Sequence, residues 1–464
     1  MSCKAVPFLV PVILAAASPA LAEDAAPALH ARAVDMLDHA IAYKSVEKTP
    51  EIANFAAYLK GILVKSGFDP NDVVIDKSGP APTLVATLKG ASDKPAILLS
   101  GHMDVVAADP KDWTRDPFTP VEEDGYIFGR GSSDNKFGVV MMTLTLARLK
   151  EEGFTPERDV KLVLSGDEET AMASTERLSK KLKGAAIVLN GDGGGGTLRE
   201  DGEPLVYALQ TAEKTYADYE VAFTNPGGHS SRPSKDNAIY HLAKALDAIA
   251  AYDFPVQTSS TTLGYFRETS KMTSGPIADA MARFAENPKD KKAIRALRAE
   301  PEYVGQLGTT CVATMLSGGH AMNALPQRAA ANVNCRIFPG VDPEDVRKKL
   351  VEIIDDPQAS VSFVETPHWS DGSPLSDSVL AAVTKAVHAR YPDLPIVPEM
   401  SAGATDSSFF RAEGIPSYGV SGLFMKPSDN FAHGLNERIP VASIDGALEH
   451  WRILITELAG AKKE

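Results

Sequence analysis

Two histidines and several acidic residues of this sequence stand at or near the ends of apolar segments. Imidazole nitrogens and carboxylate oxygens are suitable ligands for divalent cations such as Zn²⁺. Like charges that lie close together cannot all ionise cheaply, and a bound cation relieves that cost. The pattern therefore favours a metal site, and a two-metal site would also need a shared carboxylate and an open position for water. The residues in question are His102, Asp104, Asp134, Glu168, Glu169, Asp192 and His433.

Each of these residues, taken singly, also has an ordinary structural explanation. Asp104 can complete a turn after a strand, and Asp134 can cap the helix that follows it. Glu168 and Glu169 can form an exposed acidic turn. Their recurrence after apolar segments is not explained in this way. In open parallel sheets the carboxyl ends of the strands converge on one crevice, so the recurrence favours a shared site and leaves the structural alternatives open.

Helical and apolar strand segments alternate through the first half of the sequence, which is typical of an α/β fold. "PEIANFAAYLKGILVKSG" has helical spacing of apolar residues, whereas "TLVATLKG", "PAILLSG", "DVKLVLSG" and "AAIVLNG" are typical of strands. We therefore expect a catalytic domain with a mostly parallel central sheet flanked by helices. The glycine run Gly191–Gly196 lacks the spacing of a phosphate-binding loop and predicts a close approach of backbone segments.

The alternation changes near residue 207, where the sequence predicts a second domain inserted into the first. A strand and a helix are followed by a charged helical insertion at 258–303, two strands, a helix and a further strand. We expect a catalytic domain over residues 23–206 and 368–464, and a smaller α+β domain over residues 207–367.

Cys311 and Cys335 lie on the two strands predicted within the inserted domain. If these strands pair in a symmetric antiparallel register, the sulfur atoms lie close together, and an oxidising compartment permits a disulfide. Two buried thiols are the alternative, because the register cannot be read from the sequence to one residue. Both possibilities remain open at this point.

The first residues have the features of a signal peptide. Lys4 precedes the short apolar stretch "VPFLVPVILAAA", and Ala20–Ala22 forms an A-x-A cleavage signal. We expect residues 1–22 to be removed after Ala22, which predicts a periplasmic or secreted protein with no membrane attachment after cleavage. The formal net charge of −14 disfavours non-specific binding to nucleic acid or to anionic membranes.

Sequence blocks in a fixed order resemble those of the co-catalytic zinc exopeptidase and aminoacylase family, which includes glutamate carboxypeptidase, carboxypeptidase S and desuccinylases. The blocks are "SGHMDVV", "GRGSSDNK", "SGDEE", "NGDGGG", "NPGGHSSRP", "NALP", "NCRIFPG", "GATDSSFF" and "AHGLNE". The resemblance extends over essentially the whole chain after the signal peptide. The helical insertion is most similar to the carboxypeptidase S-like branch.

The resemblance implies a pair of zinc ions, for which Co²⁺ or Mn²⁺ can substitute. His102 and Asp192 would bind one ion. Glu169 and His433 would bind the other, and Asp134 would bridge the two. The peptide bond after the bridging residue is often cis in this family.

The resemblance also implies catalytic roles for three residues. Glu168 would be the general base, with a second metal ligand or a surface charge as its alternatives. Asp104 would orient the ring of His102 without binding metal. His229 would donate to the developing oxyanion, commonly from the inserted domain of the partner in a homodimer, so that this domain serves as a lid and dimerisation domain.

Three further residues match substrate-binding positions of the family. Asn323 and Arg336 would contact substrate from the inserted domain, and an arginine can hold a carboxylate with two hydrogen bonds. Gly403 would contact the substrate carboxylate through its backbone. For Arg336 an ion pair with a surface acid is the alternative.

The expected function is that of a secreted, zinc-dependent hydrolase of the amide bond in short peptides, similar to a carboxypeptidase or dipeptidase. Hydrolysis of N-acyl amino acids by the same residues is the first alternative. An inactive periplasmic binding protein and a two-metal phosphoesterase are more remote alternatives. Asp192, where some acylases and desuccinylases have Glu, favours the peptidase.

Overall fold

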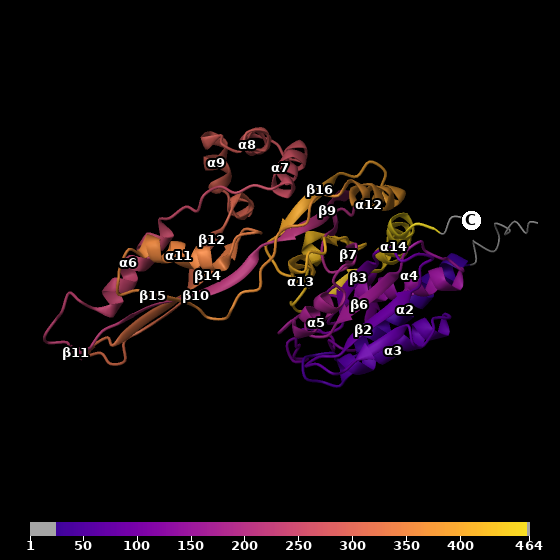
Figure 1. The fold of residues 1–464 in the computed structure, drawn as a ribbon, viewed down its shortest axis with the longest axis horizontal. Coiled ribbons are helices and arrows are strands. Elements are labelled where there is room, and N and C mark those ends of the chain that lie inside the picture. The colour runs from indigo at the N-terminus through magenta and orange to yellow at the C-terminus, as the bar shows by residue number, and fades with distance from the viewer. Residues whose placement is uncertain (1–24, 462–464) are drawn as a thin grey trace, which may run out of the picture.

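A ten-stranded mixed sheet forms the centre of the larger part of the molecule, and a four-stranded antiparallel sheet forms the centre of the smaller part (Figure 1). The computed structural model describes residues 25–461. The predicted signal peptide therefore lies outside the described residues. None of the helices within the described range has both the length and the apolar character that a membrane span needs.

The larger sheet is parallel at its centre and has antiparallel pairs toward both edges. Its order is β1-β2-β6-β3-β7-β17-β9-β8-β18, with β16 paired to β9. The pairs β6–β3, β3–β7 and β7–β17 are parallel, as expected, whereas β1, β2 and β8 pair antiparallel. The strands are β1 (Val73–Asp76), β2 (Thr83–Leu88), β3 (Ile97–His102), β6 (Val160–Ser165), β7 (Ile187–Asn190), β8 (Gly195–Leu198), β9 (Pro204–Glu213), β16 (Ile396–Ser401), β17 (Ser417–Gly419) and β18 (Phe424–Met425).

Helices cover both faces of this sheet, because side chains alternate along the buried strands. On β3, Leu99 joins the core formed with the larger group of helices, whereas Leu98 joins a separate core with Phe410 on the opposite face. The helices of the first face are α2 (Ala25–Ala42), α3 (Glu51–Lys65), α4 (Lys136–Glu151), α12 (Asp377–Arg390) and α14 (Ile444–Ala459). Those of the second face are α5 (Ala173–Lys181) and α13 (Ser407–Ala412).

The smaller sheet has one covered face and one open face. Its order is β12 (Thr310–Gly318), β14 (Arg328–Ile337), β10 (Thr215–Thr224) and β15 (Ser360–Phe363). Alternate residues of β10 and β14 form a core with α6 (Ala238–Ala250) and α11 (Pro343–Ile354). The boundary that the sequence predicts at residue 207 falls within β9, since the chain leaves the larger sheet at Glu213 and enters the smaller one at Thr215.

The helical insertion has a small core of its own and rests on the larger sheet. It contains α7 (Ser260–Met272), α8 (Pro276–Glu286), α9 (Lys291–Arg298) and α10 (Pro301–Val304), followed by the short 3₁₀ helix η1 (Gly305–Leu307). Gln306 Nε2 donates to the carbonyl of Met400 at 3.1 Å, and the hydroxyls of Thr211 and Thr261 lie 2.5 Å apart. These contacts join the insertion to β16 and β9.

The remaining elements are short. A three-stranded sheet contains β4 (Val121–Glu123), β5 (Tyr126–Phe128) and β19 (Arg438–Pro440). A two-stranded ribbon contains β11 (Gly228–His229) and β13 (Ala324–Leu325), at the end of the smaller part that lies farthest from the larger sheet (Figure 1). The 3₁₀ helices η2 (Pro427–Asp429) and η3 (Val441–Ser443) precede α14.

Cys311 and Cys335 form a disulfide. They lie directly opposite each other in the β12–β14 register, which decides between the two possibilities that the sequence leaves open. The bond joins an edge strand to its inner neighbour within the smaller sheet.

Replacing both cysteines by alanine should lower the stability of the smaller domain, because the disulfide closes a loop of 24 residues in the unfolded chain. The expected loss is about 3 kcal/mol in the free energy of unfolding. Urea unfolding followed with and without a reductant measures it. Reductant should destabilise the wild-type protein and leave the double variant unchanged; equal sensitivity of both proteins would show that the bond contributes nothing.

Candidate metal centre and active site

The predicted metal ligands come together at the carboxyl ends of the central parallel strands. His102 is the last residue of β3, Glu169 follows β6, and Asp192 follows β7. Asp134 lies two residues before the start of α4, and His433 lies in the loop after η2. Two overlapping groups of donor atoms, His102–Asp134–Glu169 and His102–Glu168–Asp192, each lie within 4.8 Å.

Asp134 lies between the two imidazoles. Its Oδ1 is 2.9 Å from Nε2 of His102, and its Oδ2 is 3.1 Å from Nε2 of His433. Glu169 Oε2 lies 2.9 Å from Nε2 of His433, and Asp192 Oδ1 lies 3.7 Å from Nε2 of His102. The arrangement therefore has two halves that share one carboxylate, as a two-cation site requires.

Asp104 orients both His102 and the segment that carries the acidic pair. Nδ1 of His102 donates to the backbone carbonyl of Asp104 at 3.0 Å, which directs Nε2 toward the site. The carboxylate of Asp104 accepts from the backbone N–H groups of Glu168 and Glu169, at 3.2 and 3.0 Å. It lies 3.6 Å from Nδ1 of His102. The side chain that was expected to position one ring thus also positions the two glutamates.

The carboxylates of the cluster are costly to ionise without a cation. Burial raises the pKa of Glu168 well above its usual value, and the charge of Asp192 raises it further. Burial, together with the charge of Asp134, raises the pKa of Glu169 to about 7. Burial also raises the pKa of Asp192.

Asp134 differs from the other carboxylates, because its pKa is lowered rather than raised. Hydrogen bonds from His102 and His433 outweigh burial and lower the pKa of Asp134. The hydrogen bond to Asp134 raises the pKa of His433 to about 9. In this arrangement the imidazole protons lie between the rings and the carboxylates and neutralise the negative charge. Divalent cations would take the place of these protons. The donor set therefore fits a pair of such ions.

A buried glutamate that the sequence reasoning missed holds the loop before α4. Glu437 accepts from the backbone N–H groups of Gly131, Ser133 and Asp134, at 2.9, 2.8 and 3.0 Å. It also pairs with Arg130 at 2.7 Å. Both residues lie in blocks that carry predicted ligands, "GRGSSDNK" and "AHGLNE", but nothing in the sequence shows that they meet. Glu437 therefore fixes the backbone from which Asp134 projects.

The peptide bond between Asp134 and Asn135 is cis, as the family resemblance implies. Asn135 Nδ2 donates to Asp192 Oδ1 at 3.0 Å. Asn135 thus connects the loop of Asp134 to the predicted ligand that follows β7.

Two of the predicted substrate-binding residues lie together at the junction of the two domains. Arg336 Nη1 donates to the carbonyl of Ala402 at 2.7 Å, and its guanidinium lies 4.7 Å from the ring centroid of Tyr216. Gly403 follows Ala402, and its N–H donates to the hydroxyl of Ser401 at 3.0 Å. The guanidinium of Arg336 is therefore hydrogen-bonded to the residue that precedes Gly403.

His229 and Asn323 lie elsewhere, at the end of the smaller domain farthest from the larger sheet (Figure 1). The backbone N–H of Ser230 donates to the carbonyl of Asn323 at 3.0 Å, so His229 at the end of β11 and Asn323 just before β13 are neighbours across the same ribbon. The imidazole of His229 is exposed and contacts the hydroxyl of Ser231 at 2.7 Å. A single chain does not bring His229 to the predicted metal ligands.

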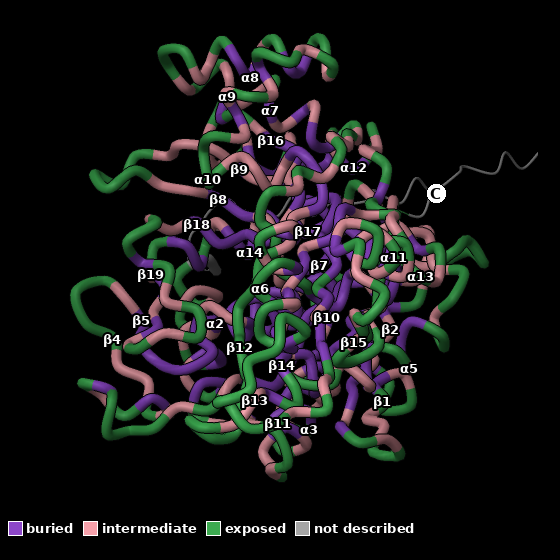
Figure 2. Tube along the Cα trace, turned by 90° about the vertical axis from the view of Figure 1, so that its left-hand side faces the viewer, coloured by how far each residue is buried: buried purple, intermediate pink, exposed green. Residues whose placement is uncertain are grey.

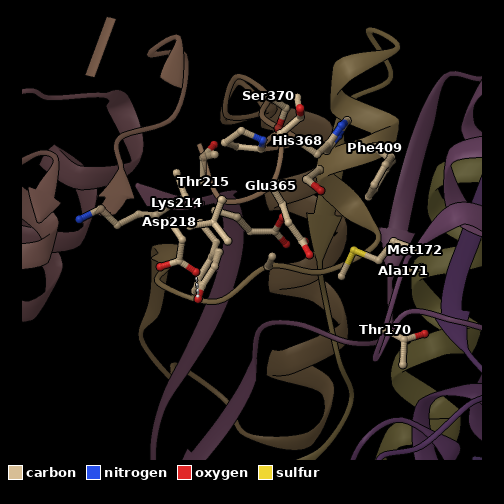
Figure 3. A pocket seen from close by; sticks show the side chains of 18 residues that line it. Thr170, Ala171, Met172, Lys214, Thr215, Asp218, Glu365, His368, Ser370 and Phe409 are labelled. Carbon is tan, nitrogen blue, oxygen red and sulfur yellow. Dashed lines mark hydrogen bonds between the residues drawn. The ribbon is translucent and has the colours of Figure 1, made fainter. Parts of the chain in front are cut away.

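Two cavities border these elements. One of about 480 Å³ is lined by Asp134, Asp192, the glycine run Gly193–Gly196 and Glu399. The other, of about 460 Å³, lies at the junction of the domains and is lined by Lys214, Glu365, Phe409 and their neighbours (Figure 3). In the second cavity, Lys214 extends away from the other labelled side chains, and its Nζ lies 3.4 Å from the hydroxyl of Thr310. Predicted metal ligands line only the first of these two cavities, so the first is the one that opens onto them.

Comparison with known proteins decides the family. The model of peptidase family M20/M25/M40 matches residues 98–457, which is most of the chain. The protein is a member of this family. An M20 enzyme hydrolyses amide bonds of peptides or of acyl-amino acids, so the M20 chain is a metallohydrolase of this class.

Relatives of known name include both acylases and peptidases. The human N-fatty-acyl-amino acid synthase/hydrolase PM20D1 is 26% identical over 413 residues, covering 86% of this chain and 80% of that protein. Carboxypeptidase S-like 2 of Dictyostelium discoideum is 24% identical over 393 residues, covering 80% and 74%. The family resemblance inferred from the ordered blocks is confirmed.

Solved structures of the family share the fold. The metallo-carboxypeptidase Sso-CP2 from Sulfolobus solfataricus superposes with a TM-score of 0.66 at 22% identity, covering 92% of this chain and 99% of that one. The YXEP protein of Bacillus subtilis, a dinuclear metal-binding peptidase, gives a TM-score of 0.59 at 14% identity, covering 92% and 98%. The expected α/β architecture is confirmed.

His102→Ala and Asp104→Asn should differ in their effect on metal content. His102→Ala removes a donor atom and should lose one of two bound ions, whereas Asp104→Asn keeps every donor atom and alters only their orientation. The second variant should bind metal with ~10–100-fold lower affinity, and hydrolysis should slow correspondingly. Metal per chain after dialysis, with Asp109→Asn on the exposed surface as control, measures the difference. Equal loss from both variants would contradict this division of roles.

Proposed function

We propose that this M20 protein is an exported, zinc-dependent hydrolase of the amide bond in short peptides, similar to a carboxypeptidase or dipeptidase. The observation that carries the proposal is the position of Asp134 between His102 and His433, with Glu168 close to His102 and Asp192.

Glu168 is the proposed general base. His102, Asp134, Glu169, Asp192 and His433 would hold two divalent cations, and the chemistry supplied by such ions is a lowered pKa of a bound water and polarisation of the amide carbonyl. The carboxylate of Glu168 accepts the proton of that water and returns it to the leaving nitrogen. Its raised pKa suits a group that must both take and release a proton.

Arg336 and Gly403 are proposed to hold the carboxylate of the substrate. Arg336 uses Nη1 on the carbonyl of Ala402, and its remaining N–H groups are available for a carboxylate. Gly403 has no side chain to obstruct the approach, and the residue is exposed. This arrangement suits a substrate that ends in a free α-carboxylate.

His229 and Asn323 are proposed to act on the site of a partner chain in a homodimer. β12 is an edge strand of the smaller sheet, and Val312, Met315 and Leu316 on it are 60, 71 and 71% exposed (Figure 2). An exposed apolar edge strand is a surface for pairing with another chain. Such pairing would supply an active site with the imidazole that its own chain does not bring.

Export to an oxidising compartment is the proposed location. The disulfide between Cys311 and Cys335 supports it, because such bonds persist outside the reducing cytosol. The signal peptide predicted at residues 1–22 is the second support.

Hydrolysis of N-acyl amino acids is the second candidate function. It is favoured by the N-fatty-acyl-amino acid synthase/hydrolases among the relatives. The same base, metal ligands and carboxylate-binding residues would serve it. The two candidates differ in the group on the carbonyl side of the scissile bond.

Glu168→Gln should keep its metal and lose hydrolysis. The amide is nearly isosteric with the carboxylate but cannot accept the proton of water, so the rate should fall by ~10²–10⁴-fold on any peptide that the wild-type protein cleaves. Release of free amino acid from dipeptides, with metal content measured on the same samples, tests it. Near-normal turnover would remove Glu168 from the base role.

Removing the metals with a chelator should abolish hydrolysis, and Zn²⁺, Co²⁺ or Mn²⁺ should restore it. The physical reason is that the buried carboxylates need cations both to stay ionised and to activate water. Activity is assayed on the dialysed protein before and after each ion is added. Full activity in metal-free protein would refute the metal centre.

Mixing inactive Glu168→Gln and His229→Ala chains should restore activity if the imidazole acts across a dimer. In a mixed dimer, one of the two sites combines an intact Glu168 with an intact His229. Random exchange should then give about a quarter of the wild-type activity, because half the dimers are mixed and each has one working site. Light scattering checks the dimer. A mixture that stays inactive despite exchange would contradict action across the dimer.

A further inference from the structure

Glu399 is an acidic side chain without a partner in the cavity that opens onto the metal ligands. It lies on β16 and is only partly exposed. Its carboxylate forms no hydrogen bond or ion pair with any residue that the structure describes. Lys426 lines the same cavity but is not paired with it. A carboxylate placed in this way is available to a ligand.

The surroundings of Glu399 disfavour a charge that stays unpaired. Burial raises its pKa. The helix α7 of the insertion covers this part of β16, where Gly264 faces Pro398. The charge of Glu399 also contributes to the raised pKa of Tyr265 on α7. A cationic group entering the cavity would offset the cost of keeping this carboxylate ionised.

The cavity connects Glu399 to the reacting centre. Asp134 and Asp192 line the same cavity as Glu399, together with the glycines Gly193–Gly196, which have no side chains to obstruct it. Neither Arg336 nor Gly403 borders this cavity. The part of a substrate that lies on the far side of the scissile bond from its carboxylate would therefore extend toward Glu399.

We propose that Glu399 determines specificity by binding a cationic amine on the carbonyl side of the scissile bond, as in the free amino terminus of a dipeptide. The inference rests on the proposed amide hydrolysis and selects between its two candidate substrates. A neutral fatty-acyl group would leave the carboxylate desolvated and unpaired, which penalises that substrate.

The test compares substrates that differ only in this amine. Metal-loaded protein is assayed with alanyl-leucine, N-acetyl-alanyl-leucine and N-acetyl-lysyl-leucine. We expect kcat/KM for the free dipeptide to exceed that for its acetylated form by about tenfold or more, as for a hydrogen bond to a charged group. If kcat/KM for N-acetyl-lysyl-leucine returns to the level of the free dipeptide, Glu399 binds a cationic side chain. If kcat/KM stays at the level of N-acetyl-alanyl-leucine, Glu399 binds the amino terminus.

Glu399→Gln should abolish this preference by slowing hydrolysis of the amine substrate alone. Glu399→Asp should retain part of it. Glu365→Gln is the matched control, because Glu365 is an exposed carboxylate that lines the other cavity (Figure 3). Thermal midpoints identify any variant that fails to fold.

A preference that survives Glu399→Gln, or an equal loss on both substrates, would overturn the inference. Binding to metal-loaded Glu168→Gln protein separates this failure from failure of the proposed function. Cleavage of none of the three substrates by the wild-type protein would refute the proposed function. The role of Glu399 is still supported if the Glu168→Gln protein binds the free dipeptide more tightly than the acetylated form and the Glu168→Gln, Glu399→Gln double variant does not. Equal binding of the free and acetylated forms overturns it.

Discussion

The position of Asp134 between two imidazoles is the constraint on which the rest of the site depends. Its two oxygen atoms face different histidines, so a rotation of this one side chain would separate both halves of the cluster. Buried Glu437 holds the backbone N–H of Asp134, and Asn135 connects the same loop to Asp192. Crowded carboxylates repel one another, so they stay together only where such backbone hydrogen bonds oppose the repulsion.

The gathering of the predicted ligands could be foreseen from the sequence because it depends on a simple property of parallel sheets. Strands that run the same way end at the same edge, so acidic or imidazole groups after β3, β6 and β7 must be close in space. The same reasoning could not reveal that the carboxylate of Asp104 accepts from the backbone of Glu168 and Glu169. That contact depends on how the turn after β6 folds back over the end of β3, which no local pattern records.

Other features could not be predicted because their partners are distant in the chain. Glu437 contacts Gly131 across 306 residues of sequence, and a single acidic residue in a loop has no periodicity that would identify it as buried.

The passage from the larger to the smaller sheet occurs at Lys214, between two strands that form one extended stretch. Without a turn or a change of composition there, the sequence placed the boundary at residue 207, inside β9. The cysteine pairing required a register exact to one residue, which only the structure provides.

β16 connects the two ends of the proposed substrate site. It carries Glu399 and leads through Ser401 to Gly403, so the proposed amine-binding and carboxylate-binding positions are four residue steps apart on one continuous segment. Such a segment spans at most about 14 Å, and an extended dipeptide spans about 7 Å. The side chains of Glu399 and Arg336 can cover the difference, whereas a much longer substrate would extend past one of the two charges. Because α7 packs on the same strand, the helical insertion holds the segment that would set this length, and the proposed binding positions at its two ends would favour a short peptide over a long acyl chain.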